Sequence, residues 1–313
     1  NEYINTKEMQ KQSGISVSCG TYYTKLFDKM IWYSSLDHSI AVSLIVWNFT
    51  KDKKQTLAGL FHDIATPVFK HSIDFMNGDY EKQESTEELT TRIINESQEI
   101  MKLLKRDGIK VEEVDNYHIY PIADNDTPML SADRLEYTLS GGLYQVRVFE
   151  LEDIKKYYGN IIIAKNEKNI DELSFKDIDI CENFIRDISK LWPRWIEDED
   201  RACMQFIADV MKWLNREGYV TIDDLYKLSE KDAKLITASK YLSDLFEEAS
   251  KVCGNRKAVN NWIISDISRI LNEKELEAEK IPFTAEHLGH LVELIDKGTI
   301  SSSIGKKVLV ELF

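Results

Sequence analysis

The sequence has no closely spaced cysteines. Its four cysteines lie far apart, at Cys19, Cys181, Cys203 and Cys253, and none of them forms a C-x-x-C pair. This spacing argues against a disulfide framework and against a zinc site made of thiolates, and it is typical of a protein kept in a reducing compartment. We therefore expect a cytoplasmic protein.

The sequence also lacks a long hydrophobic run. Its longest apolar stretches, such as Leu44–Trp47, are far shorter than the roughly 20 residues that a membrane-spanning helix needs. We therefore expect no membrane contact. With 313 residues, 43% of them hydrophobic, the chain can hold one large domain, or one domain and a smaller appendage. Because the first residue is Asn1 rather than Met, a processed N-terminus is left open.

Positive charge is scarce. The chain has 40 Lys and Arg against 54 Asp and Glu, for a net charge of −14, which argues against nonspecific binding to nucleic acid. The deficit is uneven, because Lys231–Phe313 holds 12 of the basic and 13 of the acidic residues. This change in charge predicts a first domain over residues 1–230 and a second over residues 231–313.

Two apolar segments near the start of the chain predict buried helices. Leu36–Phe49 is apolar at most positions, so we expect a central helix that is buried on nearly every side and carries His38 in its first turn. Leu57–Ile64 predicts a second helix that ends at the pair His62-Asp63. Gly59 disfavours a helix, and close approach to the helix of His38 would explain it.

The residues after this pair predict a further helix. Thr66 is a good N-cap and Pro67 a good first helical residue, so the new helix would carry Val68, Phe69 and His71. Later, a capping box at Ser85–Glu88 predicts one long helix that ends at Gly108.

The remaining pattern is also helical. Ser131 would cap a helix over residues 132–140 that Gly141-Gly142 ends. Other elements are expected as a small β-hairpin with a strand at Ile161–Ile163 and a turn at Asn166–Asn169, and as helices near Asp177–Leu191, Glu199–Asn215 and Asp223–Leu228. The fold class is therefore expected to be all-α, with at most this hairpin.

Four polar residues on three of these helices can converge. His38 and His62 are 24 positions apart, so two antiparallel helices would bring them to the same end, and Asp133 stands in the first turn of a later helix. With Asp63, they offer two imidazoles and two carboxylates. Such a set suits one divalent ion, Mn, Fe, Ni, Zn or Mg, and a bound cation makes water a nucleophile near neutral pH.

This pattern resembles the HD superfamily of metal-dependent phosphohydrolases, whose signature is a histidine, a His-Asp pair and a distant aspartate. DHSIAV, HDIATPVFKH and SADRLEY are similar to HSLGV, HDxGxxPFxH and DxDRLDY of its deoxynucleoside triphosphate triphosphohydrolase branch. The resemblance implies an HD-type helical bundle over residues 1–230. It further implies a metal held by His38, His62, Asp63 and Asp133, and hydrolysis of a nucleotide or related phosphate ester or anhydride.

The same motifs suggest residues that act on the substrate. Asp63, His71 and Arg134 are the candidate catalytic residues, and Lys70, Arg134 and Tyr137 the candidate phosphate or sugar contacts. Blander interpretations stay open. Arg134 could make a structural salt bridge, Lys70 could be solvated, and His71 could be a surface histidine.

Some positions depart from the triphosphohydrolase pattern. Ser35 stands where relatives often have arginine, Thr66 where they have histidine, and Glu81–Glu84 is a degraded form of a further motif. Because the lost groups would act on phosphate, a second interpretation is kept: a nucleotide-binding or scaffolding protein with little turnover.

The second domain resembles the helical C-terminal region of the B subunit of aspartyl/glutamyl-tRNA amidotransferase. The similarity is carried by Asn261-Trp262, Leu271-Asn272 and the string Asp296–Ser301. In that family the region helps to hold tRNA, which implies weak contact with tRNA or a translation partner; a passive appendage is the alternative. No carboxylate partner is evident for His287 and His290, so no metal is expected there. Homo-oligomerisation is left open.

Overall fold

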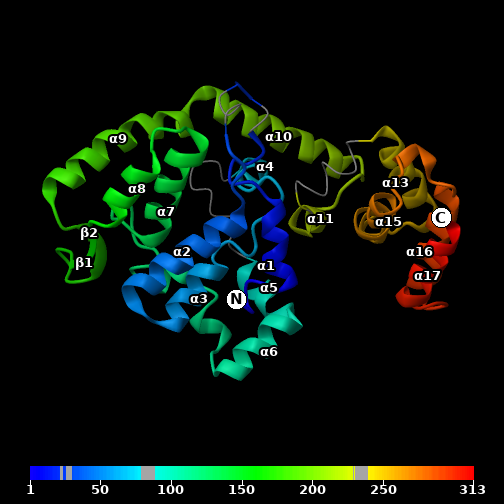
Figure 1. The fold of residues 1–313 in the computed structure, drawn as a ribbon, viewed down its shortest axis with the longest axis horizontal. Helices are drawn as coiled ribbons and strands as arrows, with labels where there is room; N and C mark the ends of the chain where they lie inside the picture. Colours follow the sequence, from blue (N-terminus) through cyan, green and yellow to red (C-terminus); the bar gives the residue numbers. More distant parts are fainter. Residues whose placement is uncertain (22–23, 26–29, 79–88, 228, 230–238) are drawn as a thin grey trace. The chain divides into compact units, whose positions relative to one another are not determined.

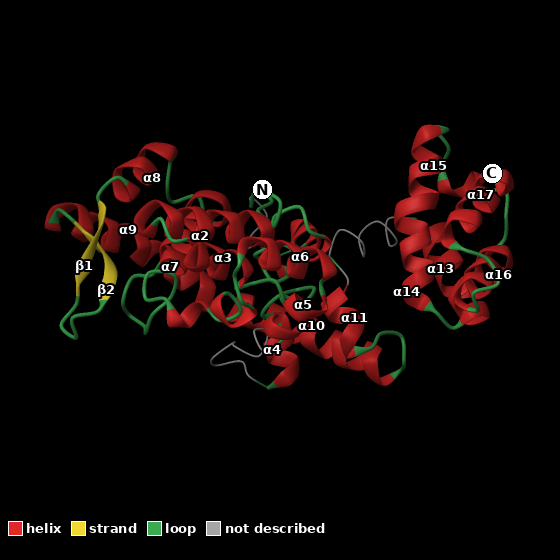
Figure 2. Cartoon of the chain, turned by 90° about the horizontal axis from the view of Figure 1, so that it is seen from below, coloured by secondary structure: helices red, strands yellow, loops and turns green. Residues whose placement is uncertain are grey.

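The computed structural model describes residues 1–313 except 22–23, 26–29, 79–88, 228 and 230–238. By its internal contacts, the chain divides into two compact units, Asn1–Glu230 and Lys231–Phe313. Both are built of helices (Figures 1 and 2), and strands in the described residues are confined to one two-stranded sheet. The predicted fold class, mainly helical with one small hairpin, is confirmed.

The first unit contains eleven labelled helices and both strands among its described residues. The helices are α1 (Lys7–Lys11), α2 (Ser35–Thr50), α3 (Lys53–Phe61), α4 (Ser72–Asn77), α5 (Thr90–Glu96), α6 (Gln98–Asp107), α7 (Ala132–Ser140), α8 (Leu151–Tyr158), α9 (Ile178–Ile196), α10 (Asp198–Arg216) and α11 (Ile222–Lys227). Strands β1 (Ile161–Lys165) and β2 (Asp171–Phe175) pair antiparallel, with Ile161 opposite Phe175.

Helices α2 and α3 form the centre of this unit. A Cβ added to Gly59 would lie 3.3 Å from Val46 Cγ2 and 3.4 Å from Val42 Cγ1, so the glycine permits the close approach that the sequence predicts. The expectation that α2 is buried on nearly every side is wrong, because Leu44 and Trp47 are 60% and 44% exposed. The helix packs on α3 and α7 and leaves one apolar face at the surface.

The segment after α3 does not form the predicted helix. Phe69 and Lys70 take left-handed backbone angles, with φ of 66° and 40°, and α4 starts only at Ser72. The backbone N–H of Val68 donates to the carbonyl of Leu225, which draws the segment into a turn against α11. A left-handed pair cannot continue an α-helix, and this turn sets the direction of the Lys70 side chain.

The single long helix predicted to end at Gly108 is instead two helices. Ser97, with ψ of 107°, separates α5 from α6, and its hydroxyl accepts from the N–H of Ile100 to cap α6. Gly108 ends α6 in the left-handed conformation, as predicted. The expected capping box at 85–88 and the motif at 81–84 lie outside the described residues.

Helix α7 covers the predicted residues and ends at Ser140 with Gly141 as its C-cap, although Gly141 takes right-handed rather than left-handed backbone angles. The chain continues as a π-helical turn over Gly141–Gln145, and the glycines admit large side chains. A Cβ on Gly141 would lie 2.5 Å from Trp195, and one on Gly142 would lie 2.2 Å from Phe149. The hairpin and the three helices expected after it are present as β1–β2, α9, α10 and α11.

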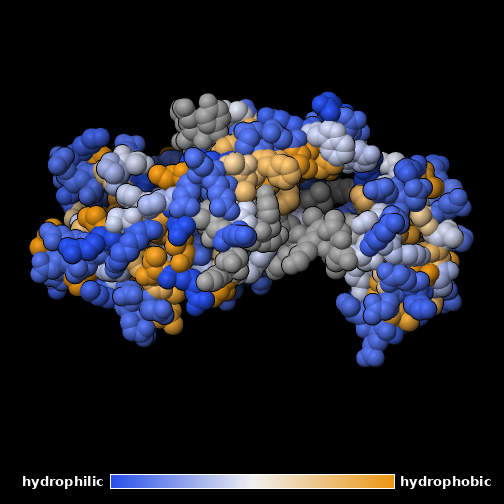
Figure 3. Space-filling model, turned by 90° about the horizontal axis from the view of Figure 1, so that it is seen from above, coloured by the Kyte–Doolittle hydropathy of each residue, from blue (hydrophilic) through white to orange (hydrophobic). Residues whose placement is uncertain are grey.

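Large apolar side chains remain exposed along α9 and α10, among them Ile185, Trp192, Phe206 and Trp213. Figure 3 shows apolar residues gathered on the side of the unit where α10 lies. None of the helices in the described part of the chain has the length and hydropathy to cross a membrane. Homo-oligomerisation stays a prediction.

The second unit is a small helical bundle with its own core. It comprises α13 (Lys240–Cys253), α14 (Arg256–Asn261), a π-helical turn (Trp262–Ile267), α15 (Ser268–Glu273), α16 (Ala285–Asp296) and α17 (Ser302–Leu312). Ile263, Ile267 and Leu288 are fully buried in this core. Gly289 lets α16 approach α13 closely, because a Cβ there would lie 2.6 Å from Val252.

Candidate functional site

Three of the four predicted metal ligands converge at one end of the α2–α3 pair. The Nε2 atom of His38 lies 3.1 Å from Nε2 of His62 and 3.1 Å from Oδ1 of Asp133. The His62 Nε2 atom lies 3.7 Å from the same Asp133 oxygen. His38 comes from the start of α2, His62 from the residue after α3, and Asp133 from the first turn of α7. These three side chains can offer one ligand atom each to a single ion.

Hydrogen bonds at the other ring nitrogens orient both imidazoles. His38 Nδ1 contacts Glu136 Oε2 in a short hydrogen bond, and His62 Nδ1 lies 2.8 Å from the carbonyl oxygen of Gly59. A carbonyl can only accept, so His62 Nδ1 carries the hydrogen and Nε2 is left as an acceptor. Such outer partners fix the tautomer and the direction of metal-binding histidines.

The electrostatics of the cluster favour a bound cation. Burial opposes a charge on His38, but the carboxylates of Glu136 and Asp133 outweigh it and raise the pKa of His38 to about 10. Burial likewise opposes charge on Asp133, but the His38 hydrogen bond and both imidazoles lower the pKa of that carboxyl. The two carboxylates therefore favour a positive charge between these groups, which either a proton on His38 or a metal cation in place of that proton can supply.

Asp63, the fourth predicted ligand, is held beside the cluster by Lys70. Its Oδ2 atom lies 3.9 Å from His38 Nε2 and 3.8 Å from His62 Nε2, but only 2.5 Å from Lys70 Nζ. Burial opposes both charges, yet each group stabilises the other, so the pKa of Asp63 is lowered and that of Lys70 raised. Lys70 is only 7% exposed, so its solvated interpretation is wrong.

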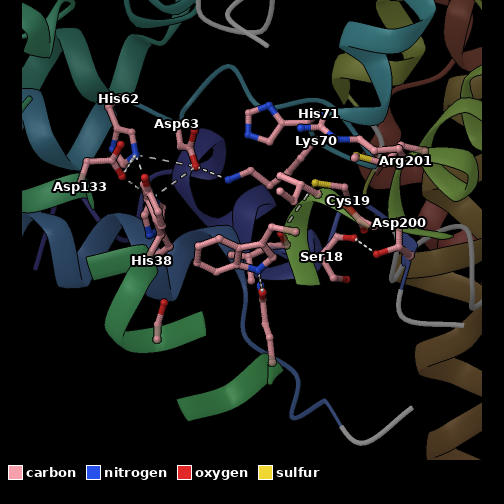
Figure 4. Close-up of a pocket in the computed structure, with 18 of the residues that line it drawn as sticks. Ser18, Cys19, His38, His62, Asp63, Lys70, His71, Asp133, Asp200 and Arg201 are labelled. Carbon is pink, nitrogen blue, oxygen red and sulfur yellow. Dashed lines mark hydrogen bonds and ion pairs between the residues drawn. The ribbon is translucent and has the colours of Figure 1, made fainter. Parts of the chain in front are cut away.

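The cluster opens into a cavity of about 460 Å³. In Figure 4, His38, His62 and Asp133 lie on one side of Asp63 and Lys70 on the other. The cavity is lined by all four predicted ligands together with Lys70, His71 and Tyr137, and also by Cys19, Tyr117, Gln145, Trp195, Asp200 and Arg201. His71 Nδ1 lies 2.9 Å from Asp74 Oδ2, and burial raises the pKa of Tyr137 to about 12.

Arg134 does not line this cavity, and its predicted contact with substrate is not supported by the geometry. Its guanidinium donates to the side chain of Asn125 at 2.6 Å, to the carbonyl of Met129 at 2.5 Å and to Asp124 at 3.1 Å. It therefore holds the 124–130 loop against the start of α7. This is the structural salt bridge that the sequence left open as the alternative.

Two of the three departures from the triphosphohydrolase pattern lie among the described residues, and both are outside the cavity wall. Ser35 and Thr66 are buried, and neither is among the residues that line the cavity. A phosphate in the cavity would therefore meet Lys70, His71 and Tyr137 rather than these two hydroxyls.

Sequence reasoning missed Glu136, although it organises the site. Besides His38, its carboxylate accepts from the hydroxyl of Tyr33 at 2.6 Å and it is 4% exposed. The available signal was its spacing: Glu136 follows Asp133 by three positions, so both lie on one face of α7.

The histidines of the second unit behave differently. His287 Nδ1 contacts the Thr284 cap of α16, and His290 Nδ1 lies 3.4 Å from Glu293. Both histidines are exposed, and no metal-binding group among the described residues includes them.

Comparison with known proteins finds a similarity that includes part of the second unit. Residues 244–313 match the GatB domain family. The chain is 30% identical over 211 residues to the B subunit of aspartyl/glutamyl-tRNA(Asn/Gln) amidotransferase from Clostridium novyi, and the match covers 67% of this chain and 40% of that protein. The corresponding protein of Thermoanaerobacter sp. is 44% identical over 123 residues, covering 39% of this chain and 25% of the relative.

These matches confirm the predicted resemblance of the C-terminal region. The chain spans 40% or less of the length of these two relatives. The 211-residue match is longer than the second unit, so the similarity reaches into the first. Among solved structures, a hypothetical protein from Aquifex aeolicus has a similar fold, with a TM-score of 0.55, 17% identity and coverage of 79% of this chain and 69% of that one.

Proposed function

We propose that the first unit is a metal-dependent phosphohydrolase of the HD type, acting on a phosphate ester or anhydride with a nucleotide as the expected substrate class. The observation that carries this proposal is the convergence of His38 Nε2, His62 Nε2 and an Asp133 oxygen. Each histidine is oriented through Nδ1 by Glu136 or by the Gly59 carbonyl.

The spacing of these atoms fits one ion. Metal–nitrogen bonds of about 2.0–2.1 Å place two imidazole nitrogens on one ion about 3 Å apart, and the two Nε2 atoms are 3.1 Å apart. Nitrogen and carboxylate donors suit Mn, Fe, Ni or Zn, and Mg is the harder alternative. His38, His62 and Asp133 would hold the ion, with Asp63 adjacent as the fourth ligand.

A divalent ion held by His38, His62 and Asp133 would lower the pKa of a water and would neutralise charge on phosphoryl oxygens. In the proposed hydrolysis a water oxygen bonds to phosphorus while the bond from phosphorus to the leaving oxygen breaks. The proton that the water loses passes to solvent, and the leaving oxygen takes one up. His71, held by Asp74 through Nδ1, keeps Nε2 for a hydrogen bond to the phosphate or its leaving oxygen. Tyr137, like any tyrosine near neutral pH, keeps its hydroxyl proton, and burial raises its pKa further, to about 12, so it offers a hydroxyl donor.

Two measurements test the proposal. Elemental analysis of the wild-type protein and of Asp133→Ala should find a divalent ion in the first and much less in the second; equal content would refute the metal site. A screen of nucleoside mono-, di- and triphosphates with Mn²⁺ should show sustained release of phosphate, triphosphate or nucleoside. Nucleotide binding without turnover would instead support the nucleotide-binding alternative.

For the second unit, we propose contact with tRNA or with a translation partner, supported by the GatB domain match. This unit has nearly balanced charge, so it repels a polyanion less than the first unit does, and a few phosphate contacts would make binding weak and salt-dependent. Titration of the full chain with bulk tRNA at low and moderate salt tests this. Absence of binding at low salt would favour a passive appendage.

A further inference from the structure

Lys70 is held in an unusual position. Its side chain is 8% exposed, and Nζ donates to Asp63 Oδ2 at 2.5 Å. The residue is the second of two consecutive left-handed residues, a conformation that costs energy in a residue with a side chain. Gly20 supports the turn, because a Cβ there would lie 2.7 Å from Phe69 Cδ1. This strained turn places the ammonium group of Lys70 next to Asp63.

Asp63 is paired with that ammonium group rather than with the histidines. Its Oδ2 atom lies 2.5 Å from Lys70 Nζ but 3.9 Å and 3.8 Å from the Nε2 atoms of His38 and His62. The atoms close enough to share one ion belong to His38, His62 and Asp133. A divalent cation and the Lys70 ammonium therefore compete for one carboxylate.

If a cation draws Asp63 into the cluster, Lys70 loses its partner. A buried charge without a partner is strongly unfavourable, and among the described residues Asp63 supplies the one acceptor within hydrogen-bond distance of Lys70 Nζ. Lys70 lines the same cavity as His71 and Tyr137. An anion that enters this cavity next to the cation is the group that can satisfy it.

We propose that Lys70 is an exchangeable charge, which pairs with Asp63 while the cluster holds no divalent cation and binds a phosphate oxygen once it does. The inference rests on the proposed function, because it requires a cation at the cluster. It adds a dedicated anion subsite to that function and couples the two ligands, so that each favours the binding of the other.

The exchange predicts opposite effects on two ligands when Lys70 is replaced by methionine. In Lys70→Met, Mn²⁺ alone should bind about tenfold or more tightly than in the wild type, because Asp63 is released to the cluster. Inorganic phosphate, titrated with Mn²⁺ at saturation, should bind about tenfold or more weakly, because its charged partner is gone. Both magnitudes are on the scale of a charge-assisted hydrogen bond.

Isothermal titration calorimetry measures both affinities on the full chain. Unchanged or weaker Mn²⁺ binding, or unchanged phosphate binding, would overturn the inference.

Arg201→Met is the matched control, since Arg201 lines the same cavity and carries the same charge. It should tighten Mn²⁺ binding much less than Lys70→Met does. Equal tightening would mean that net charge explains the result and that pairing with Asp63 does not.

Lys70→Gln guards against a folding defect in Lys70→Met, because its shorter neutral amide can still hydrogen-bond to Asp63. It should also bind Mn²⁺ more tightly and phosphate more weakly than the wild type, with a smaller gain in Mn²⁺ affinity than Lys70→Met.

The metal site and the charge exchange fail in different ways. A wild-type protein that binds no Mn²⁺ refutes the metal site, whereas a wild type that binds Mn²⁺ with Lys70 variants indistinguishable from it refutes only the exchange.

Discussion

The two units of this chain each contain a pair of histidines, and the pairs have opposite surroundings. His38 and His62 are buried, come from different helices and point Nε2 toward the same place. His287 and His290 share one helix face, are exposed, and each contacts a residue three positions away. Three of these histidines lie within helices and His62 follows the last residue of α3, so secondary structure alone does not separate the pairs.

The difference lies in what burial demands. An exposed histidine is satisfied by water and a local contact, whereas a buried one needs partners for both ring nitrogens. In the first unit Glu136 and the Gly59 carbonyl supply those at Nδ1, and the Nε2 side is shared with Asp133. Such convergence of buried ligand atoms, more than the residue types, marks a candidate metal centre.

The largest expected effect comes from removing one member of the buried pair. His62→Ala should weaken Mn²⁺ binding by more than about 100-fold, because the loss of an outer partner alone costs about 10–100-fold. Calorimetric titration with Mn²⁺ measures this. His287→Ala, the corresponding change in the second unit, should leave the affinity as it is. Similar losses in both variants would remove the distinction between the pairs.

A core substitution in the second unit should separate stability from metal binding. Ile267 is fully buried, and Ile267→Ala should cost about 2–5 kcal/mol of that unit's free energy of unfolding. Denaturant unfolding followed by circular dichroism gives the loss, and Mn²⁺ titration of the same sample should match the wild type. Weakened metal binding would show that the site depends on the second unit.

The role of Glu136 can be tested against a carboxylate that contacts an exposed histidine. Glu136→Gln should weaken Mn²⁺ binding by about 10–100-fold, because the amide no longer stabilises the His38 Nδ1–H with a full negative charge. Glu293→Gln, which changes the neighbour of His290, should have no effect on Mn²⁺ affinity. If Glu136→Gln binds Mn²⁺ normally, Glu136 does not support the site.

A smaller, pH-dependent effect is expected at the cavity wall. Burial raises the pKa of Asp200 from 3.8 to about 6 in the folded protein, so its contribution to stability is complete below about pH 4 and is lost as the pH rises through 6. Asp200→Asn has no carboxyl to ionise, so its stability does not fall in this way as the pH rises. At pH 8 its free energy of unfolding should exceed that of the wild type by about 1 kcal/mol, allowing for solvent screening. At pH 4 no comparable difference is expected. Thermal unfolding of both proteins at the two pH values checks this, and a pH-independent difference would contradict it.

The smallest effect should follow from removing the second unit altogether. A protein that ends at residue 230 should unfold cooperatively and bind Mn²⁺ as the full chain does, because all the candidate ligands lie in the first unit. Calorimetry and Mn²⁺ titration test both statements. Loss of the transition or of the metal would place part of the second unit in the core of the first.

The sequence predicted those features of the fold and site that depend on regular helix geometry. The 24-residue separation of His38 and His62 and the place of Asp133 at the start of α7 were enough to predict that three candidate ligand atoms come together. Gly59 indicated the contact between α2 and α3, because a glycine permits the close approach of the two helices that the structure shows. These inferences succeed because a helical repeat fixes where a side chain lies.

Features that depend on tertiary contacts could not be predicted. The hydrogen bond from Val68 to Leu225 replaced a well-signalled helix with a left-handed turn, and Lys70 reaches Asp63 only because of that turn. Gly141 and Gly142 mark the end of α7 as predicted, but the room that they make for Trp195 and Phe149 has no signal in the local sequence. Arg134 matched a substrate-binding motif, but the carbonyls and carboxylate that surround it come from a loop without a periodic pattern.

The loop that follows His62-Asp63 is held by residues distant in the chain, which bears on how the site is made. Gln12 donates to the carbonyl of Ile64, while Lys11 Nζ donates to the carbonyls of Thr66 and Tyr226. The contact between Lys11 and Tyr226 spans 215 positions. The contact of Lys11 with Tyr226 and the hydrogen bond from Val68 to Leu225 can form only after the ribosome has added these distant residues. A nascent chain that already carries all the candidate ligands would therefore still lack two of the contacts that hold this loop.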